Sequence, residues 1–334
     1  DGKIVGTDSS VPGLTRLYRN FHLKILYFSA FSAPSAVNCY KTRKKTMIGT
    51  HQETTSLITM SEEEFCRFGE FIHTKCGIKL PSSKKTMLEA RLQKRLRCMG
   101  IKSFHDYGNY VFSQTGMKDE LVHMIDAVTT NKTDFFREPH CFDFLVQVAL
   151  PELVVNRKPG TQEKFMVWSA GCSSGEEPYT LAMVLSEFAG RYPGFHFSIL
   201  ATDISTKALK TAIRAVYEEA RVEPVPLPFN RKYLMVSKDK SEGMVRIVPE
   251  LRALVKFQRL NFMDGNFGIQ ASMDVIFCRN VLIYFDKKTQ EELLNHLCRH
   301  LVPGGYLAIG HAEVITDADI PLKRVAQSVY RKAR

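Results

Sequence analysis

The chain has 334 residues, of which 44% are hydrophobic and 24% are charged, a composition typical of globular proteins with about two domains. No apolar run reaches the roughly 20 residues that a membrane-spanning helix needs, and the eight cysteines follow neither a metal-ligand nor a disulfide pattern. These features argue against membrane insertion, a structural metal and secretion. We therefore expect a cytoplasmic protein that needs no metal.

The net charge of +11 is concentrated in two stretches. Residues 1–59 hold 8 basic and 3 acidic side chains, residues 84–102 hold 7 basic and 1 acidic side chain, and the rest of the chain is neutral. Proteins that bind nucleic acids usually spread basic residues over a whole face, so we expect no nucleic-acid partner. We interpret residues 1–59 as an unassigned extension, either non-native or disordered, and leave them out of the predicted fold.

Residues 60–140 have a helical pattern that ends in a linker. Ser61 and Glu64 form a capping box, which opens a helix that stops near Gly77. In the basic stretch KKTMLEARLQKRLRCMG, the leucines fall on one helical face and the cations on its flank and opposite side. We predict a docking surface for an acidic partner, with a merely solvated surface as the alternative. Its residues are Arg91, Lys94, Arg95 and Arg97.

Strands and helices alternate over residues 141–334, which predicts an α/β domain with a mostly parallel sheet covered by helices on both faces. The predicted strands are KFMVWSA, FSILATD, VKFQRLNF, MDVIFCRN and GYLAIG, and the predicted helices run from Glu176 to Phe188, from Thr206 onward, and from Thr289 to Leu301. Residues from about 218 to 250 contain four prolines and a hairpin-like stretch, so we interpret them as an inserted subdomain. His296 and His300 fit the end of an amphipathic helix better than a metal site.

The stretch WSAGCSSGEEPYTLA (168–182) predicts a strand, a Gly/Ser turn and a helix. A phosphate is a poor ligand for this turn, because Glu176 and Glu177 place two negative charges at the helix start. Gly171–Gly175 matches the G-x-S-x-G nucleophile elbow, with Ser173 as the nucleophile. Asp274 and His311 follow in the chain order of the hydrolases, yet the paired acids would oppose the oxyanion, so a serine esterase is a minor alternative.

A third ligand class fits the turn and the strand that follows it. Asp203 ends that strand about 30 residues after the turn, the spacing at which an acid binds ribose hydroxyls. A glycine turn with acids and without a pyrophosphate cradle predicts a nucleoside that carries no phosphate. S-adenosylmethionine is such a nucleoside, and its sulfonium and ammonium charges suit a pocket rich in carboxylates.

Five motifs resemble, in order and spacing, the chemotaxis receptor methyltransferases (CheR family). They are TTNKTDFFREPHCF (129–142), WSAGCSSGEEPYTLA, ATDIS, LNF (260–262) and FCRNVLIYFDKKTQ (277–290). The family methylates glutamate side chains of chemoreceptors, and the likeness runs from about Met60 to the C-terminus. It implies a small N-terminal helical domain and a class I, Rossmann-like methyltransferase domain with an inserted small antiparallel β subdomain.

The resemblance also implies which residues hold S-adenosylmethionine and release S-adenosylhomocysteine. Asn131, Thr133 and Arg137 would reach the cofactor from the linker, Glu177 and Asp203 would hold its amino-acid end and ribose, Asn261 and Phe262 its adenine side, and Arg279 and Asn280 the floor below its methionine portion. Glu176 is the alternative to Glu177.

The chemistry needs no general base, because a glutamate with a pKa of about 4.3 is already an anion at neutral pH. We predict that Arg137 orients the incoming carboxylate and that Tyr284 lies beside the transferred methyl group; a structural arginine and a core aromatic are the alternatives. The implied partners are the cytoplasmic helices of chemoreceptors. We expect this protein to be a monomer that does not insert into the membrane. Rival functions are methylation of nucleic acids or small molecules, the esterase, and a non-catalytic module that binds S-adenosylmethionine.

Overall fold

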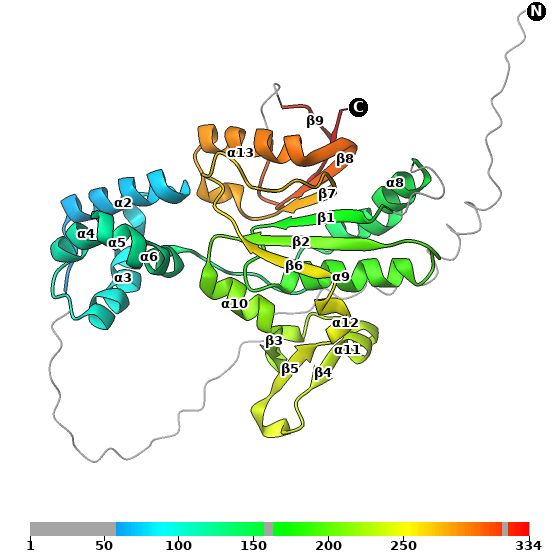
Figure 1. Cartoon of the computed structure of the whole chain (residues 1–334), viewed down its shortest axis with the longest axis horizontal. Helices are drawn as coiled ribbons and strands as arrows, with labels where there is room; N and C mark the ends of the chain where they lie inside the picture. Colours follow the sequence, from blue (N-terminus) through cyan, green and yellow to red (C-terminus); the bar gives the residue numbers. More distant parts are fainter. Residues whose placement is uncertain (1–57, 157–162, 316–319, 334) are drawn as a thin grey trace, which may run out of the picture. The chain divides into compact units, whose positions relative to one another are not determined.

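The computed structural model describes residues 58–156, 163–315 and 320–333. Except for its last two residues, the extension predicted for residues 1–59 lies outside this described part. The described chain opens with a group of helices, here called the helical domain (Figure 1). Its helices are α2 (Glu62–Cys76), α3 (Lys85–Met99), α4 (Phe104–Phe112), α5 (Gln114–Asp119) and α6 (Leu121–Val128).

The predicted start of α2 is confirmed. The Ser61 hydroxyl accepts a hydrogen bond from Glu64 N (3.1 Å), and Ser61 N donates to the Glu64 carboxylate (2.7 Å), so the capping box is complete. The helix ends at Gly77, whose φ of 72° is the left-handed conformation that glycine adopts without strain. The core of the helical domain forms from apolar faces of α2, α3, α4 and α6.

The basic helix α3 packs through its leucines, as its pattern predicts: Leu88, Leu92 and Leu96 are fully buried. Its arginines have internal partners as well. Arg95 donates two hydrogen bonds to the buried carboxylate of Glu120 (2.7 and 2.6 Å), which also accepts from the Tyr107 hydroxyl (2.9 Å). This network ties α3 to α4 and to the start of α6.

Replacing Glu120 with glutamine is expected to lower the free energy of unfolding by about 2 kcal/mol, because Arg95 would remain partly buried without its anionic partner. Urea denaturation followed by circular dichroism measures the change. The matched control is Glu62→Gln, which breaks an exposed ion pair with Lys85 and should cost less than about 0.5 kcal/mol. Equal losses for both variants would contradict a structural role for the buried network.

A seven-stranded sheet follows, in the order β6-β2-β1-β7-β8-β10-β9. Its strands are β1 (Phe165–Ala170), β2 (Phe197–Asp203), β6 (Val255–Arg259), β7 (Met273–Cys278), β8 (Leu301–Ile309), β9 (Leu322–Ala326) and β10 (Val329–Lys332). The first five strands in the spatial order pair in parallel, whereas β10 pairs antiparallel with both β8 and β9.

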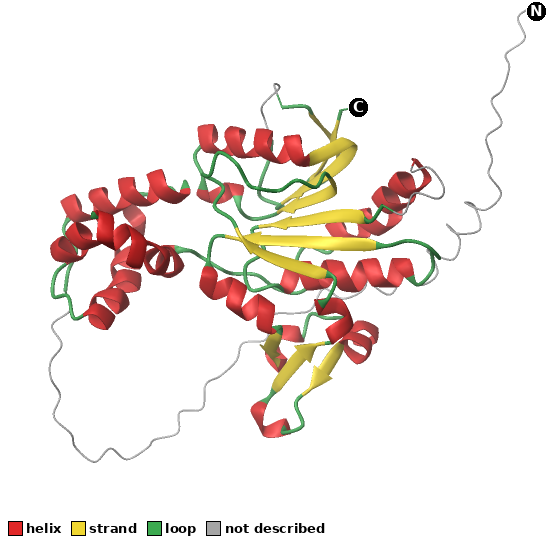
Figure 2. Ribbon diagram, in the orientation of Figure 1, coloured by secondary structure: helices red, strands yellow, loops and turns green. Residues whose placement is uncertain are grey.

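Helices cover both faces of this sheet, as the alternating pattern predicts (Figure 2). They are α7 (His140–Phe144), α8 (Leu150–Asn156), α9 (Glu176–Ala189), α10 (Thr206–Arg214) and α13 (Lys287–His300), and a π-helical segment (Leu145–Ala149) joins α7 to α8. Successive residues of β1 point to opposite faces: Val167 packs in the core that includes α9, and Trp168 packs in the core that includes α13. At the end of α13, His296 and His300 contact the Phe267 ring, with centroids 5.0 and 5.9 Å apart.

The predicted insertion contains a second, three-stranded antiparallel sheet in the order β3-β5-β4 (Figure 1). The elements of this inserted subdomain are β3 (Val216–Glu218), α11 (Leu227–Tyr233), β4 (Leu234–Val236), β5 (Met244–Ile247) and α12 (Pro249–Arg252). The predicted fold class is therefore confirmed, including its small helical domain and its inserted β subdomain. In the described part of the chain, no helix combines the length and the apolar content that crossing a membrane requires.

Candidate active site

A cavity of about 300 Å³ lies where strands β1, β2 and β7 end. In the sheet, β1 has β2 on one side and β7 on the other, so the strand order reverses at this point. Parallel sheets bind ligands in the crevice at such a reversal. Residues of the helical domain, among them Ile78 and Met87, complete the lining.

The cavity brings together every residue that the sequence predicts to bind the cofactor. They are Asn131, Thr133, Arg137, Glu177, Asp203, Asn261, Phe262, Arg279 and Asn280. Tyr284, the second predicted catalytic residue, lines the same cavity. The Asn261 side chain also donates to Lys75 O (2.7 Å), which ties this wall to α2. The individual roles of these residues stay predictions.

The glycine turn after β1 is shaped by close contacts that only glycine permits. Gly171 has a φ of 87°, and a Cβ there would lie 2.5 Å from Cγ2 of Val281. The next polar residue, Ser173, donates its backbone N–H to the Asp203 carboxylate (2.8 Å), which also accepts from Ser205 N (2.8 Å). Burial raises the pKa of Asp203, and these backbone donors oppose that rise. The turn and the acid at the end of β2 therefore form one hydrogen-bonded unit.

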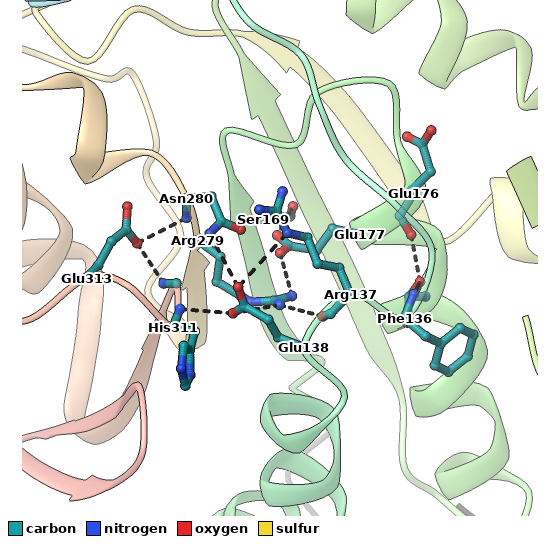
Figure 3. Close-up of polar contacts among 12 residues, drawn as sticks. Phe136, Arg137, Glu138, Ser169, Glu176, Glu177, Arg279, Asn280, His311 and Glu313 are labelled. Carbon is teal, nitrogen blue, oxygen red and sulfur yellow. Dashed lines mark hydrogen bonds and ion pairs between the residues drawn. The ribbon is translucent and has the colours of Figure 1, made fainter. Parts of the chain in front are cut away.

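The two glutamates at the start of α9 point in different directions (Figure 3). Glu176 is fully buried, forms an ion pair with Arg221 of the inserted subdomain and accepts from the Ser174 hydroxyl (2.7 Å). Glu177 lines the cavity, where it accepts from the Ser169 hydroxyl (2.7 Å). Of the two alternatives, Glu177 is therefore the one placed to meet a ligand.

The geometry does not support the serine esterase. The Ser173 hydroxyl donates a hydrogen bond to the carbonyl of Asn131 (3.0 Å), so it has a structural partner. Asp274 lies near the beginning of β7, whereas Ser173 follows the end of β1, and the two strands are parallel. Asp274 and Ser173 therefore lie at opposite ends of two neighbouring strands. Ser173, Asp274 and His311 do not form a catalytic triad.

Arg279 is the buried cation at the end of β7, and it is held between two carboxylates (Figure 3). Its Nη1 donates to Glu177 (3.1 Å), and its Nη2 donates to Glu138 (3.1 Å) and to the carbonyl of Arg137. Burial opposes the charge of Arg279, but Glu177 and Glu138 outweigh it and raise its pKa above the usual value. Burial likewise raises the pKa of Glu177, and Arg279 opposes that rise.

Glu138 accepts hydrogen bonds from several donors although it does not line the cavity. Besides Arg279, its carboxylate accepts from Asn280 Nδ2 (3.3 Å) and from His311 N (3.0 Å). Burial alone would raise the pKa of Glu138, but Arg279, Asn280 and His311 lower it, so the side chain stays ionised. Sequence reasoning missed this residue; its only signal was its place in the FFRE part of the linker motif.

A second glutamate, Glu313, fixes the loop that follows β7. It accepts from the backbone N–H groups of Asn280 (3.0 Å), Gly310 (2.6 Å) and Ile283 (3.2 Å). Asn280 has a φ of 58°, an uncommon conformation outside glycine, and these contacts hold it there. Together, Glu138 and Glu313 determine where the loop carrying Asn280 and Tyr284 lies.

Arg137 stands on a tight backbone segment between two residues in the left-handed region, Phe136 and Glu138, each with a φ of 53°. Its guanidinium donates to Lys132 O (3.1 Å) and lies 4.0 Å from the Glu138 carboxylate, with a third of the side chain exposed. It is therefore accessible from the cavity. Burial raises the pKa of Tyr284, so its phenol is protonated at neutral pH and able to donate.

The four predicted docking residues fall into two classes. Arg91 donates to the carbonyls of Val128 and Thr129, and Arg95 is held by Glu120, so both guanidinium groups have structural partners. Lys94 and Arg97 are exposed on α3. Docking stays a prediction, and Lys94 and Arg97 are the residues whose cations are best placed for it.

One cluster of metal-capable groups occurs among the described residues: Glu138, His140 and Cys141, with ligand atoms within 4.8 Å of one another. Its groups do not suit a metal ion. The Glu138 carboxylate already serves Arg279, and burial raises the pKa of the Cys141 thiol to about 11, which disfavours the thiolate that a metal needs. We assign no metal to it.

The cavity fits S-adenosylmethionine. Glu177 and Asp203 provide carboxylates for positively charged and hydroxyl groups, and the glycine turn offers no lysine for a phosphate. Arg279 supplies a complementary feature: its Nε is buried and has no hydrogen-bond partner among the described residues, so an acceptor such as an amino-acid carboxylate would satisfy it.

Comparison with known proteins agrees with this geometry. Residues 131–331 match the family model "CheR methyltransferase, SAM binding domain", and residues 63–129 match "CheR methyltransferase, all-alpha domain". A chemotaxis protein methyltransferase of Borreliella burgdorferi is 38% identical over 276 residues, covering 82% of this chain and 96% of the relative. Chemotaxis protein methyltransferase 2 of Pseudomonas aeruginosa is 36% identical over 273 residues (82% and 94%), and the Escherichia coli chemotaxis protein methyltransferase is 35% identical over 276 residues (83% and 93%).

These matches cover both the helical domain and the seven-stranded sheet, and the first of them is a domain that binds S-adenosylmethionine. S-adenosylmethionine is therefore the cofactor of this protein. With the fold, the cavity and the relatives in agreement, the chain belongs to the CheR methyltransferase family.

Proposed function

We propose that this protein transfers a methyl group from S-adenosylmethionine to glutamate side chains of chemoreceptors, giving methyl esters. The names of its relatives, chemotaxis protein methyltransferases, support a chemoreceptor substrate. The observation that carries the proposal is how charge is distributed around the cavity. The carboxylates of Asp203, which is buried, and Glu177, which is mostly buried, lie inside. The exposed charges of the lining are Lys79, Lys84 and Lys132 against one acid, Asp134.

This arrangement suits a cationic cofactor and an anionic substrate. The interior carboxylates attract positive charge, and the exposed lysines with Arg137 attract a carboxylate that approaches from solvent. None of the described residues that line the cavity is a histidine. A carboxylate nucleophile needs no general base, so this lining suffices for glutamate methylation.

The cofactor supplies a methyl group bonded to a positively charged sulfur. A carboxylate oxygen of the substrate forms the new O–CH3 bond, the S–CH3 bond breaks, and its electron pair stays on sulfur. Arg137 orients the incoming carboxylate, and the Tyr284 ring limits water beside it. Because the reaction neutralises two charges, a closed and poorly hydrated cavity favours it.

The test uses radiolabelled S-adenosylmethionine, the full chain and membranes that contain chemoreceptors. Mild base is expected to release most of the incorporated label as volatile methanol, because methyl esters hydrolyse whereas N-methyl groups do not. Receptors whose methylated glutamates are replaced by alanine serve as the control and should take up little label. Base-stable label would contradict glutamate methylation, and binding without any transfer would favour a non-catalytic module.

A further inference from the structure

A second cavity of about 400 Å³ lies beside the cofactor cavity and opens to solvent. Its walls come from α3 and α6 of the helical domain and from α10, which follows β2. Thr129 and Asn131 line both cavities, so the second cavity, here called the side groove, adjoins the cofactor cavity.

The side groove is lined by three cations and one acid. Arg91 and Lys94 come from α3 and Lys207 comes from α10, against Asp126 of α6. The carboxylate of Asp126 has structural partners. It accepts hydrogen bonds from the Ser205 hydroxyl (2.9 Å), the Thr206 hydroxyl (2.5 Å) and Lys207 N (3.3 Å). It thereby caps the N-terminus of α10 and fixes that helix against the helical domain.

The positive charge continues along both helices beyond the side groove. On α10, the cations Lys207, Lys210 and Arg214 recur at helical spacing and are exposed, and the helix carries no acidic residue. On α3, Lys94 and Arg97 are exposed in the same way. Two cationic stripes, one from each helix, therefore flank one opening.

We propose that α10 forms the second wall of the surface that docks the methyl-accepting substrate, an acidic helix laid along the side groove between α3 and α10. The proposal rests on the proposed function, and it adds Lys207, Lys210 and Arg214 to a surface that sequence patterns placed on α3 alone. Charge complementarity favours a glutamate-bearing helix. From the side groove, a glutamate side chain reaches the cofactor cavity past Thr129 and Asn131.

The test compares Lys207→Glu/Lys210→Glu with a matched control, Lys287→Glu/Lys288→Glu. The control pair is also exposed, and it lies at the start of α13. For receptor-containing membranes at low ionic strength, the α10 variant is expected to raise KM about tenfold with kcat nearly unchanged. The difference should shrink as salt is added, because exposed charges are screened. The control should keep the wild-type KM.

Calorimetry with S-adenosylhomocysteine separates docking from misfolding, since both variants should bind it as the wild type does. An unchanged KM for the α10 variant, with active wild type, would overturn the α10 surface and leave the proposed function intact. If the wild type itself transfers no base-labile methyl group to receptors, the proposed function fails instead. A rise in KM that persists in high salt would also overturn the electrostatic proposal.

Discussion

Asparagine in place of Asp203 is expected to weaken the binding of both S-adenosylmethionine and S-adenosylhomocysteine by about 100-fold or more. Asp203 lines the cofactor cavity while both of its oxygens accept backbone N–H groups, from Ser173 and Ser205 at 2.8 Å. An asparagine NH2 would face one of these donors, which disturbs the hydrogen-bonded unit of turn and acid that shapes this part of the cavity. Loss of the carboxylate that is predicted to hold the ribose adds to this effect. Isothermal titration calorimetry measures both affinities.

Asp264→Asn provides the control for this substitution. Asp264 lies in the loop that also carries Asn261, but it is exposed and does not line the cavity. Its replacement should leave both affinities within about twofold of wild type, as surface substitutions usually do. If Asp203→Asn behaved like this control, the cofactor would not use the acid at the end of β2.

Much of the fold could be predicted because its signals are local. The capping box of Ser61 and Glu64, the strand-turn-helix stretch around Gly171 and the alternation of strands and helices all lie within short windows of sequence. By contrast, β9 and β10 were not predicted, since LKRVA and VYRK are short and contain charges. They exist because β10 pairs with β8, a partner some 20 residues away.

The predicted closing strand was also too short. The sequence predicts a helix that ends at Leu301 and a strand, GYLAIG, that starts at Gly305, yet β8 already begins at Leu301, directly after α13. Gly305 permits close strand pairing in this region, since a Cβ there would lie 2.8 Å from the carbonyl of Asp274 on the neighbouring strand. The register of β7 and β8 shifts near this point. Which residue faces a glycine across a sheet cannot be inferred from the glycine itself.

The same limit applies to the charged residues. The row of basic residues on α3 could be predicted from the sequence. The groups that accept hydrogen bonds from Arg91 and Arg95, however, lie about 25 to 39 residues further along the chain. The motifs identified the residues that line the cavity, whereas they did not identify Glu138, which acts on Arg279 from 141 residues away in sequence. The residues that line the cofactor cavity could be predicted from short motifs, whereas the residues that hold them in place required the structure.

Glu138→Gln is expected to weaken the binding of S-adenosylmethionine about 50-fold and that of S-adenosylhomocysteine only about fivefold. The donors around this side chain come from Arg279, Asn280 and His311, so a glutamine NH2 would face donors on every side. Arg279 would also lose one of its two carboxylate partners. This cation would then pair more strongly with Glu177, which lines the cavity.

The ratio of the two affinities distinguishes an effect on the charge around Arg279 from an effect on the shape of the loop. Both ligands have the same amino-acid and nucleoside groups, but only S-adenosylmethionine carries the sulfonium charge. A disturbed loop would weaken both ligands equally, whereas an Arg279 that is less neutralised repels the sulfonium in particular. Glu138→Asp keeps the carboxylate and should restore most of the discrimination, even if shortening the side chain lowers both affinities.

Glu187→Gln is the matched control. Glu187 lies near the C-terminal end of α9, forms an ion pair with Lys232 and does not line the cavity. It should leave both affinities unchanged. If Glu138→Gln weakened both ligands by the same factor, its carboxylate would only hold the loop in shape. A wild-type affinity for both ligands would mean that Glu177 alone neutralises Arg279, and the position of Glu138 beside that cation would then have no effect on cofactor binding.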